Sequence, residues 1–313
     1  MIIMMTRIHI YISMKRIDEI LKATESRVSA PFTTDIEFLD KALGGLYPGE
    51  MTMICGDADS GKTALMIRLI HRIAFEENMP VLVLLDGMSE HTFIACMTAY
   101  YCNIKTSDVH QVLVNPISSE EEVVAYQELL SEKPIYFSDY LELPSKSMDI
   151  LKDDILSHGI KAVFVEQATD FVMVMPDGSK AGFQMKKFAK ETQTVVIAEY
   201  EWGDDQCHPL TLLGFPRDGF TSNSDNIIHM LDYENYGFFY NEKGEDLHGC
   251  IEMNIMKHKG VASTGKKVVM RKDCLYYRCP ELAPLNEMKA IADSNPAIRQ
   301  LKDSFDCEIV SPF

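Results

Sequence analysis

Several features that would point to a particular function class are scarce in this sequence. Among its eight cysteines no two form a Cys-x-x-Cys pair, and the nearest spacing, Cys274 to Cys279, has no matching pair of histidines. We therefore expect no structural zinc, and we expect the reduced thiols of a cytoplasmic protein. No apolar run approaches the roughly 20 residues that cross a bilayer, so we expect no membrane partner. Arg7 and His9 interrupt the apolar first thirteen residues, which argues against a secretory signal.

Positive charge is also scarce. Lys and Arg number 30 against 47 Asp and Glu, which gives a net charge of −17. This balance excludes binding to nucleic acid through bulk charge, so any such contact must come from local basic loops. The 46% apolar and 25% charged residues are ordinary globular values and exclude a disordered chain. A length of 313 residues fits one large domain or two smaller ones.

From Thr33 onward, segments that predict strands alternate with segments that predict helices. The runs VLVLL at 81–85 and AVFV at 162–165 are typical of strands buried on both faces of a parallel sheet. The alternation predicts a doubly wound α/β sheet. The predicted strands are 51–55, 81–85, 135–138, 162–165 and 194–198, and the predicted helices are 63–75, 89–101, 148–157 and 183–192.

The character of the chain changes after residue 226. Short strand-like pieces at 226–232, 237–240, 250–257, 266–270 and 275–277 predict hairpins that extend one edge of the sheet. We therefore predict three parts. Residues 1–32 form an N-terminal arm with a linker helix near Lys15–Thr24, residues 33–280 form the main domain, and residues 281–313 form an acidic, partly helical tail. Met14 is a plausible natural start, so we expect the first thirteen residues to be a translation-start artefact or an arm.

The strongest single motif is Gly56-Asp57-Ala58-Asp59-Ser60-Gly61-Lys62-Thr63, which matches GxxxxGK[ST]. It follows a predicted strand and opens a predicted helix, the context that a phosphate loop requires. Glycines let backbone N–H groups turn toward phosphates, Lys62 reaches the β and γ oxygens, and Thr63 ligates Mg²⁺. We therefore predict ATP and Mg²⁺ as cofactors. Asp57 and Asp59 are unusual, because they place two negative charges in a loop that binds an anion.

The segments around this motif resemble a known family. LDKALGGLYPGEMTMICGDADSGKT, MPVLVLLDGMSEHTFIACMTAYYCNI, HGIKAVFVEQATDFV, FAKETQTVVIAEY and GCIEMNIMKHKGVASTGKKVVM are similar to the motor domain of DnaB-type replicative helicases. The resemblance spans about residues 15–278 in collinear order and omits the family's separate N-terminal domain. It implies a RecA-like P-loop NTPase core, with a mostly parallel sheet flanked by helices and a C-terminal antiparallel hairpin extension.

The resemblance also implies roles for single residues. Lys62 and Thr63 match the family's phosphate loop fully. Glu166, after the strand AVFV, stands where the family has its magnesium-binding Asp, and it keeps the charge with one methylene more. Asp86, or Gly87 in a shifted alignment, stands where the family has the catalytic Glu that activates water. Both substitutions alter the reach of a carboxylate in a site that depends on geometry.

Two further positions depart from the family pattern. Glu199 stands where the family has a phosphate-sensing Gln, and a carboxylate there repels a γ-phosphate unless it is protonated or paired. Lys257-His258-Lys259 stands where the family has a Lys-x-Arg pair that reaches the neighbouring subunit's γ-phosphate. Lys259 keeps the charge of the Arg but loses its bidentate fork. The alternative interpretation of Lys257 and Lys259 is a solvated basic turn.

Contact with DNA, as the resemblance implies it, comes from two loops at 175–182 and 206–221. Lys180 and Arg217 are the unambiguous cations in these loops, so they are the predicted DNA-binding residues. Such a groove binds single strands with little sequence preference. The alternative interpretation is that both are plain solvent loops.

We therefore expect an ATP-hydrolysing DNA helicase or translocase motor that acts on single-stranded DNA as a homo-hexameric ring, with a primase or helicase loader as a further partner. Two alternatives stay open. One is a catalytically impaired nucleotide-binding accessory subunit of a replication complex, suggested by Asp86, Glu166 and Glu199. The other is a recombination-type RecA-like ATPase that assembles as a filament.

Overall fold

The computed structural model describes residue 17 and residues 31–102, 121–139, 148–168, 181–201, 219–241, 243–262 and 266–271. The chain divides into two units, Met1–Ala30 and Pro31–Phe313, and the fold below belongs to the second. Of the first unit only Ile17 is described; it is helical and exposed. The rest of the predicted arm and linker helix, and the predicted tail at 281–313, lie outside the described residues, so the predicted division into three parts stays a prediction.

In the described part of the chain nine strands form one sheet, in the order β3-β2-β4-β5-β1-β6-β7-β8, with β9 beside β7. The first six strands pair in parallel and β7 to β9 pair antiparallel, which confirms the predicted core and its hairpin extension. The strands are β1 (Met51–Gly56), β2 (Val81–Leu85), β3 (Ile135–Asp139), β4 (Ala162–Val165), β5 (Val195–Glu201), β6 (Asn226–Asp232), β7 (Cys250–His258), β8 (Val261–Ala262) and β9 (Lys267–Arg271).

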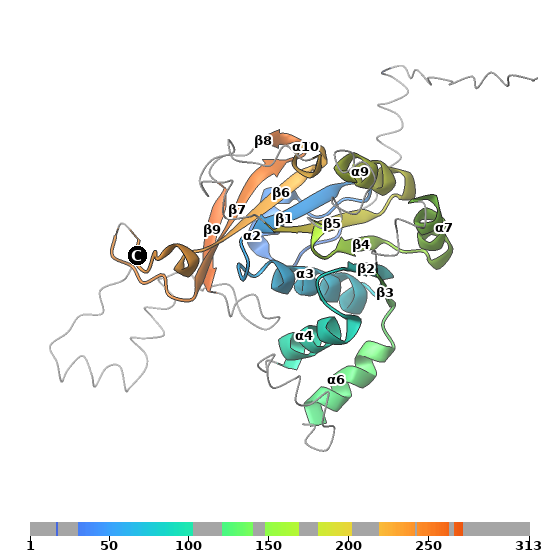
Figure 1. Ribbon diagram of the computed structural model, residues 1–313, viewed down its shortest axis with the longest axis horizontal. Helices are drawn as coiled ribbons and strands as arrows, with labels where there is room; N and C mark the ends of the chain where they lie inside the picture. The colour runs from blue at the N-terminus through green and yellow to red at the C-terminus, as the bar shows by residue number, and fades with distance from the viewer. Residues whose placement is uncertain are drawn as a thin grey trace, which may run out of the picture. The chain divides into compact units, whose positions relative to one another are not determined.

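Helices cover both faces of this sheet, as Figure 1 shows. On one face α3 (Lys62–His71) and α4 (Glu90–Cys102) pack on alternate strand residues such as Val83 and Ile197. On the other face α7 (Met148–His158), α9 (Ala181–Thr192) and α10 (Phe220–Asn223) cover the intervening residues. Two apolar layers therefore bury the central strands on both sides, which explains why the sequences of those strands are continuous apolar runs.

The structure differs from the sequence prediction in several places. The helix predicted at 63–75 is α3 followed by a π-helical turn, η1 (Arg72–Glu76). The prediction of a strand at 237–240 was wrong, because this segment forms only an isolated bridge from Tyr240 to Asp246. The strand predicted at 275–277 lies outside the described residues. Three α-helices were not predicted: α2 (Glu37–Leu43), α6 (Glu121–Ser131) and the short α10.

The topology creates two edges that matter for function. The carboxyl ends of the parallel strands β1, β2, β4, β5 and β6 meet at one edge, which we call the carboxyl edge. Their amino ends meet at the opposite, amino edge. Because β7 runs antiparallel to β6, its last residues lie at the amino edge. Within the described residues, no helix combines the length and apolar character that a membrane span needs.

Candidate functional site

The phosphate loop Gly56–Thr63 lies at the carboxyl edge, where β1 ends and α3 begins. Gly56 is required by space, because a Cβ atom there would lie 2.2 Å from the carbonyl oxygen of Met230 on β6. Gly61 has a φ of 87° and caps the amino end of α3. The first turn of this ten-residue helix therefore opens toward the loop, with the free N–H groups and positive dipole end that bind anions.

The lysine of the motif folds back into its own loop. Lys62 is 4% exposed, and its Nζ donates a hydrogen bond to the Asp57 carbonyl oxygen at 2.5 Å. The Ser60 hydroxyl donates to the same oxygen at 2.8 Å. The loop is thus held in a closed curve around a buried ammonium group, the arrangement that a phosphate chain needs.

The threonine of the motif contacts a carboxylate from the neighbouring strand. Thr63 Oγ1 donates to Glu199, with its two carboxylate oxygens at 2.9 Å and 3.1 Å. Glu199 lies there because β5 pairs with β1, which sets it opposite Ile54, and because strand alternation turns it to the same face as Ile197 and α3. Burial raises the pKa of Glu199 to about 7, although Lys62 and the Thr63 hydrogen bond oppose this shift.

The carboxylate after β4 is tied to the end of β2. Glu166 is 1% exposed, and its Oε2 accepts hydrogen bonds from the backbone N–H groups of Asp86 at 3.1 Å and Gly87 at 2.7 Å. The Glu166 carboxylate therefore fixes the turn that carries Asp86. Asp86 itself is half-buried at the carboxyl edge.

Hard oxygen ligands suit Mg²⁺, which proteins usually hold through one or two carboxylates and the substrate's phosphates. The Thr63 hydroxyl and the Glu199 carboxylate form such a donor set at the carboxyl edge, and the Glu166 carboxylate lies at the neighbouring strand end. Within the described residues no group of three or more His, Cys, Asp or Glu side chains is placed to hold a metal ion alone. A hydroxyl and a carboxylate beside a phosphate loop fit a cation that arrives with a nucleotide.

A segment that the sequence analysis missed covers the phosphate loop. Asn235 Nδ2 donates to the Ala58 carbonyl oxygen at 3.1 Å, and the Tyr236 hydroxyl donates to Asp57 Oδ2. The Asp57 carboxylate is thus engaged by Tyr236, while Asp59 is exposed in a left-handed conformation with a φ of 60°. The aromatic residues of this region were the available signal, and the prediction of a strand at 237–240 did not use them in this way.

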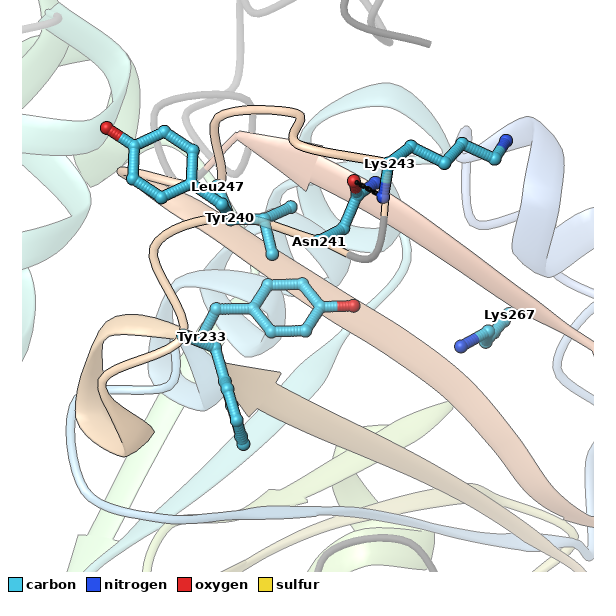
Figure 2. Close-up of a pocket in the computed structure, with 7 residues that line it drawn as sticks. Tyr233, Tyr240, Asn241, Lys243, Leu247 and Lys267 are labelled. Atoms are coloured by element: carbon cyan, nitrogen blue, oxygen red, sulfur yellow. Dashed lines mark hydrogen bonds between the residues drawn. The ribbon is translucent and has the colours of Figure 1, made fainter.

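The same connection between β6 and β7 forms a cavity of about 440 Å³. Figure 2 shows the cavity with its lining residues, among them Tyr233, Tyr240, Lys243 and Lys267. The Tyr233 hydroxyl donates to Glu252 Oε2 at 2.7 Å, and burial raises the pKa of this tyrosine. Tyrosine rings and lysine ammonium groups together can receive a flat group that carries negative charge.

The basic segment at the end of β7 lies at the amino edge. Lys257 pairs with Ile227, which lies opposite Met53, so Lys257 is about 10 Å along the strands from Gly56. Its Nζ donates to the carbonyl oxygens of Thr221 at 3.1 Å and Ser222 at 3.0 Å, and burial lowers its pKa.

Lys259, beyond the end of β7, is exposed, and its Nζ lies 4.5 Å from the ring centroid of Tyr47. Lys257 and Lys259 therefore lie at the opposite ends of the strands from the phosphate loop of their own chain.

The predicted DNA-binding residues Lys180 and Arg217 lie outside the described residues. On the helix that follows the first predicted loop, Lys186 forms an ion pair with Asp225 and donates to the Gly49 carbonyl oxygen at 3.0 Å. The Asp225 carboxylate also accepts the Met51 N–H at 2.7 Å. Lys186 is therefore part of the fold at the amino edge.

Comparison with known proteins decides the family. The model of the DnaB-like helicase C terminal domain matches residues 32–200, which is more than half of the chain. The chain belongs to this family. A "Probable replicative DNA helicase" of Guillardia theta is 28% identical over 134 residues, a match that covers 41% of this chain and 22% of that protein. The matched part is thus about a fifth of that relative's length.

Solved structures share the fold of this chain. One, reported as the ATPase domain of another protein, superimposes with a TM-score of 0.63 at 17% identity, over 87% of this chain and 100% of that one. A DnaB-like replicative helicase, described with its interactions with primase, superimposes with a TM-score of 0.63 at 16% identity, over 83% of this chain and 66% of that one. At this identity the likeness shows the fold, and it confirms the predicted RecA-like core.

Within this DnaB-like domain the structure brings together some of the predicted site residues and separates others. The loop residues Gly56–Thr63, Glu166, Glu199 and Asp86 lie at the carboxyl edge. Lys257 and Lys259 lie at the amino edge. The predicted roles of all these residues in catalysis and binding stay predictions.

Proposed function

We propose that this chain is the ATP-dependent motor of a replicative helicase, which moves along single-stranded DNA as a ring of identical copies, most simply a hexamer. The observation that carries the proposal is the phosphate loop, with Lys62 inside its curve and Thr63 at the start of α3. This arrangement suits the β- and γ-phosphates of ATP. Family membership supports the assignment to replication.

In this proposal the loop Gly56–Thr63 holds the phosphates, and Thr63 with a neighbouring carboxylate holds Mg²⁺. The cation neutralises phosphate charge when it is bound. Asp86 orients the attacking water, and its backbone is fixed by the Glu166 carboxylate. A fixed position matters because proton abstraction needs hydrogen-bond reach to the water.

Lys257 and Lys259 act on the nucleotide of a neighbouring copy. Their position at the amino edge, away from their own phosphate loop, supports a role between copies. Lys259 is the freer of the two, since it is exposed, whereas Lys257 donates to two carbonyl oxygens. Cations at this place stabilise the charge that develops during phosphoryl transfer.

We also propose that Lys180 and Arg217 contact the DNA backbone, which fits a motor with little sequence preference. A primase or a helicase loader is a further proposed partner. The primase interaction is suggested by the structural neighbour, whose reported structure includes it.

A second candidate is a nucleotide-binding subunit that does not turn over. The observation that favours it is the pair of carboxylates Glu166 and Glu199, of which one is bound to backbone N–H groups and the other to Thr63. In this case ATP would fix the assembly without powering movement.

Steady-state ATPase of the full chain, with and without single-stranded DNA, separates these candidates. The motor predicts turnover that single-stranded DNA stimulates and that Lys62→Ala reduces at least about 100-fold. Lys190→Ala, at an exposed position of α9, is the matched control and should keep wild-type turnover. If assembled rings bind ATP but turn it over no faster than Lys62→Ala does, the result would favour the accessory subunit.

A further inference from the structure

We infer that Glu199, rather than Glu166, is the carboxylate that holds the divalent cation of a bound nucleotide together with Thr63. The inference rests on the proposed nucleotide binding and names the cation site within it. According to this inference, the loop binds the magnesium complex of a nucleoside di- or triphosphate and binds the metal-free nucleotide weakly.

The first step is the position of Glu199. Both of its carboxylate oxygens lie within 3.1 Å of Thr63 Oγ1, the hydroxyl that the motif offers to the cation. A cation beside this hydroxyl therefore meets the Glu199 carboxylate within the same shell of ligands. Oxygen ligands from a hydroxyl, a carboxylate and phosphates are those that Mg²⁺ and Mn²⁺ prefer.

The second step is the engagement of Glu166. Its Oε2 accepts two backbone N–H groups, from Asp86 and Gly87, at the end of β2. Turning this carboxylate toward Thr63 would deprive both donors of this acceptor and release the turn that carries Asp86. Glu166 therefore serves better as the anchor of that turn than as a ligand.

The third step is charge. A nucleotide brings several negative charges to a buried site in which Lys62 lies near the Glu199 carboxylate and Glu166 adds a second negative charge near it. Without a cation, Glu199 either repels the phosphates or takes up a proton, and both outcomes weaken nucleotide binding. A divalent cation between them reverses the sign of this interaction. Nucleotide affinity must then depend on the cation more steeply when Glu199 is present than when its charge is removed.

Equilibrium binding of a fluorescent ADP analogue to the full chain tests this, with Mg²⁺ present and with Mg²⁺ removed by EDTA. We expect removal of Mg²⁺ to weaken binding to the wild type by about 100-fold or more. Glu199→Gln keeps the shape of the side chain and an acceptor for Thr63. In this variant, removal of Mg²⁺ should weaken nucleotide binding by about tenfold or less. Glu199→Asp should keep most of the wild-type dependence, because it keeps the charge.

Glu166→Gln tests the competing ligand, since it removes the other buried carboxylate charge at the neighbouring strand end. It should keep the wild-type ratio of affinities with and without Mg²⁺. Electron paramagnetic resonance of Mn²⁺ in the presence of ADP gives a second readout, in which Glu199→Gln alone should weaken Mn²⁺ binding about tenfold.

The opposite pattern, with cation dependence lost in Glu166→Gln and kept in Glu199→Gln, would overturn the inference and leave nucleotide binding intact. Failure of the nucleotide to bind the wild type under either condition would overturn the proposed function itself, and the inference with it. Thermal unfolding of each variant identifies any that does not fold. If Glu199→Gln does not fold, Glu166→Gln decides, because loss of the cation dependence in that variant would overturn the inference.

Discussion

The two edges of the sheet carry complementary charge. The carboxyl edge holds the buried carboxylates Glu166 and Glu199 and the buried ammonium group of Lys62, which lies near Glu199. The amino edge presents Lys257 near the end of β7 and Lys259 just beyond it. Phosphoryl transfer needs a phosphate-binding loop with a metal cation on one side of the phosphates, and further positively charged groups on the other side. In the proposed ring, each copy would supply half of these groups at each edge, and two neighbouring copies would complete the set.

Polar groups at both edges also maintain the fold. At the carboxyl edge the Glu166 carboxylate accepts two backbone N–H groups. At the amino edge the Asp225 carboxylate accepts the Met51 N–H and pairs with Lys186. Substitutions at either edge therefore affect stability as well as function, and the two effects must be measured separately.

The largest effect is expected at the phosphate loop. Gly56→Ala should lower the free energy of unfolding by about 3 kcal/mol or more, because its Cβ would lie 2.2 Å from the backbone oxygen of Met230. Gly159→Ala is the control: its φ is +65° but nothing lies within 4 Å, so it should cost about 1 kcal/mol. Urea unfolding measures both. Equal costs would mean that the loop has room for a side chain.

The carboxylate anchors come next. Glu166→Ala should cost about 2 to 3 kcal/mol, because two backbone donors lose their acceptor, and Glu166→Gln about 1 kcal/mol, because an amide oxygen remains. At the amino edge Asp225→Ala should cost about 2 kcal/mol, since it leaves Lys186 and the Met51 N–H without this partner. Chemical unfolding at neutral pH checks both edges. A neutral Glu166→Ala would show that the anchor is dispensable.

Two buried histidines should make the fold sensitive to acid. Burial lowers the pKa of His71, at the far end of α3, and of His229, on β6, to about 4 in each case. In the unfolded chain both histidines have a pKa near 6.5. The free energy of unfolding is therefore highest above about pH 6.5, and it decreases as the pH falls toward 4. Each histidine should lower the free energy of unfolding by about 2 kcal/mol between pH 7 and pH 5.

His71→Phe separates this effect from general acid denaturation. His71 stacks on Phe75 with ring centroids 4.0 Å apart, so a phenyl ring fits the same stack. Unfolding at pH 7 and pH 5 should show a smaller loss for the variant, by about 2 kcal/mol. The same loss in both proteins would place the acid sensitivity elsewhere.

The smallest effect on stability is expected at the exposed end of the amino edge. Lys259→Ala removes a cation from the Tyr47 ring and should cost about 0.5 to 1 kcal/mol. Binding of nucleotide to the variant's own phosphate loop should stay unchanged, while turnover in the assembled ring should fall about 100-fold. Thermal unfolding, nucleotide binding and ATPase measure the three properties. Loss of nucleotide binding in the isolated chain would place Lys259 at its own loop.

Much of the fold was predictable because buried parallel strands have a simple pattern. VLVLL and AVFV match β2 and β4 residue for residue, since both faces of these strands are covered and every residue is apolar. The segment 237–240 was wrongly predicted because its aromatic residues have strand propensity, whereas the structure places this region beside the phosphate loop through Asn235 and Tyr236. Tertiary contacts override local preference there.

The candidate site was predictable only in part. The spacing of glycines, lysine and threonine identifies the phosphate loop, because backbone geometry demands those residue types. The contact between Thr63 and Glu199 depends on the pairing of β5 with β1 and on which face Glu199 occupies, and no local pattern gives either. The pairing of Lys186 with Asp225 likewise joins residues 39 positions apart.

Mixing two inactive variants tests most directly whether the two edges work together between copies. Lys62→Ala has a defective carboxyl edge and an intact amino edge, and Lys259→Ala has the reverse. If subunits mix at random, about a quarter of the contacts between copies combine both intact edges, so the mixture should regain about a quarter of wild-type ATPase. A mixture no more active than its separate components would contradict a site shared between copies.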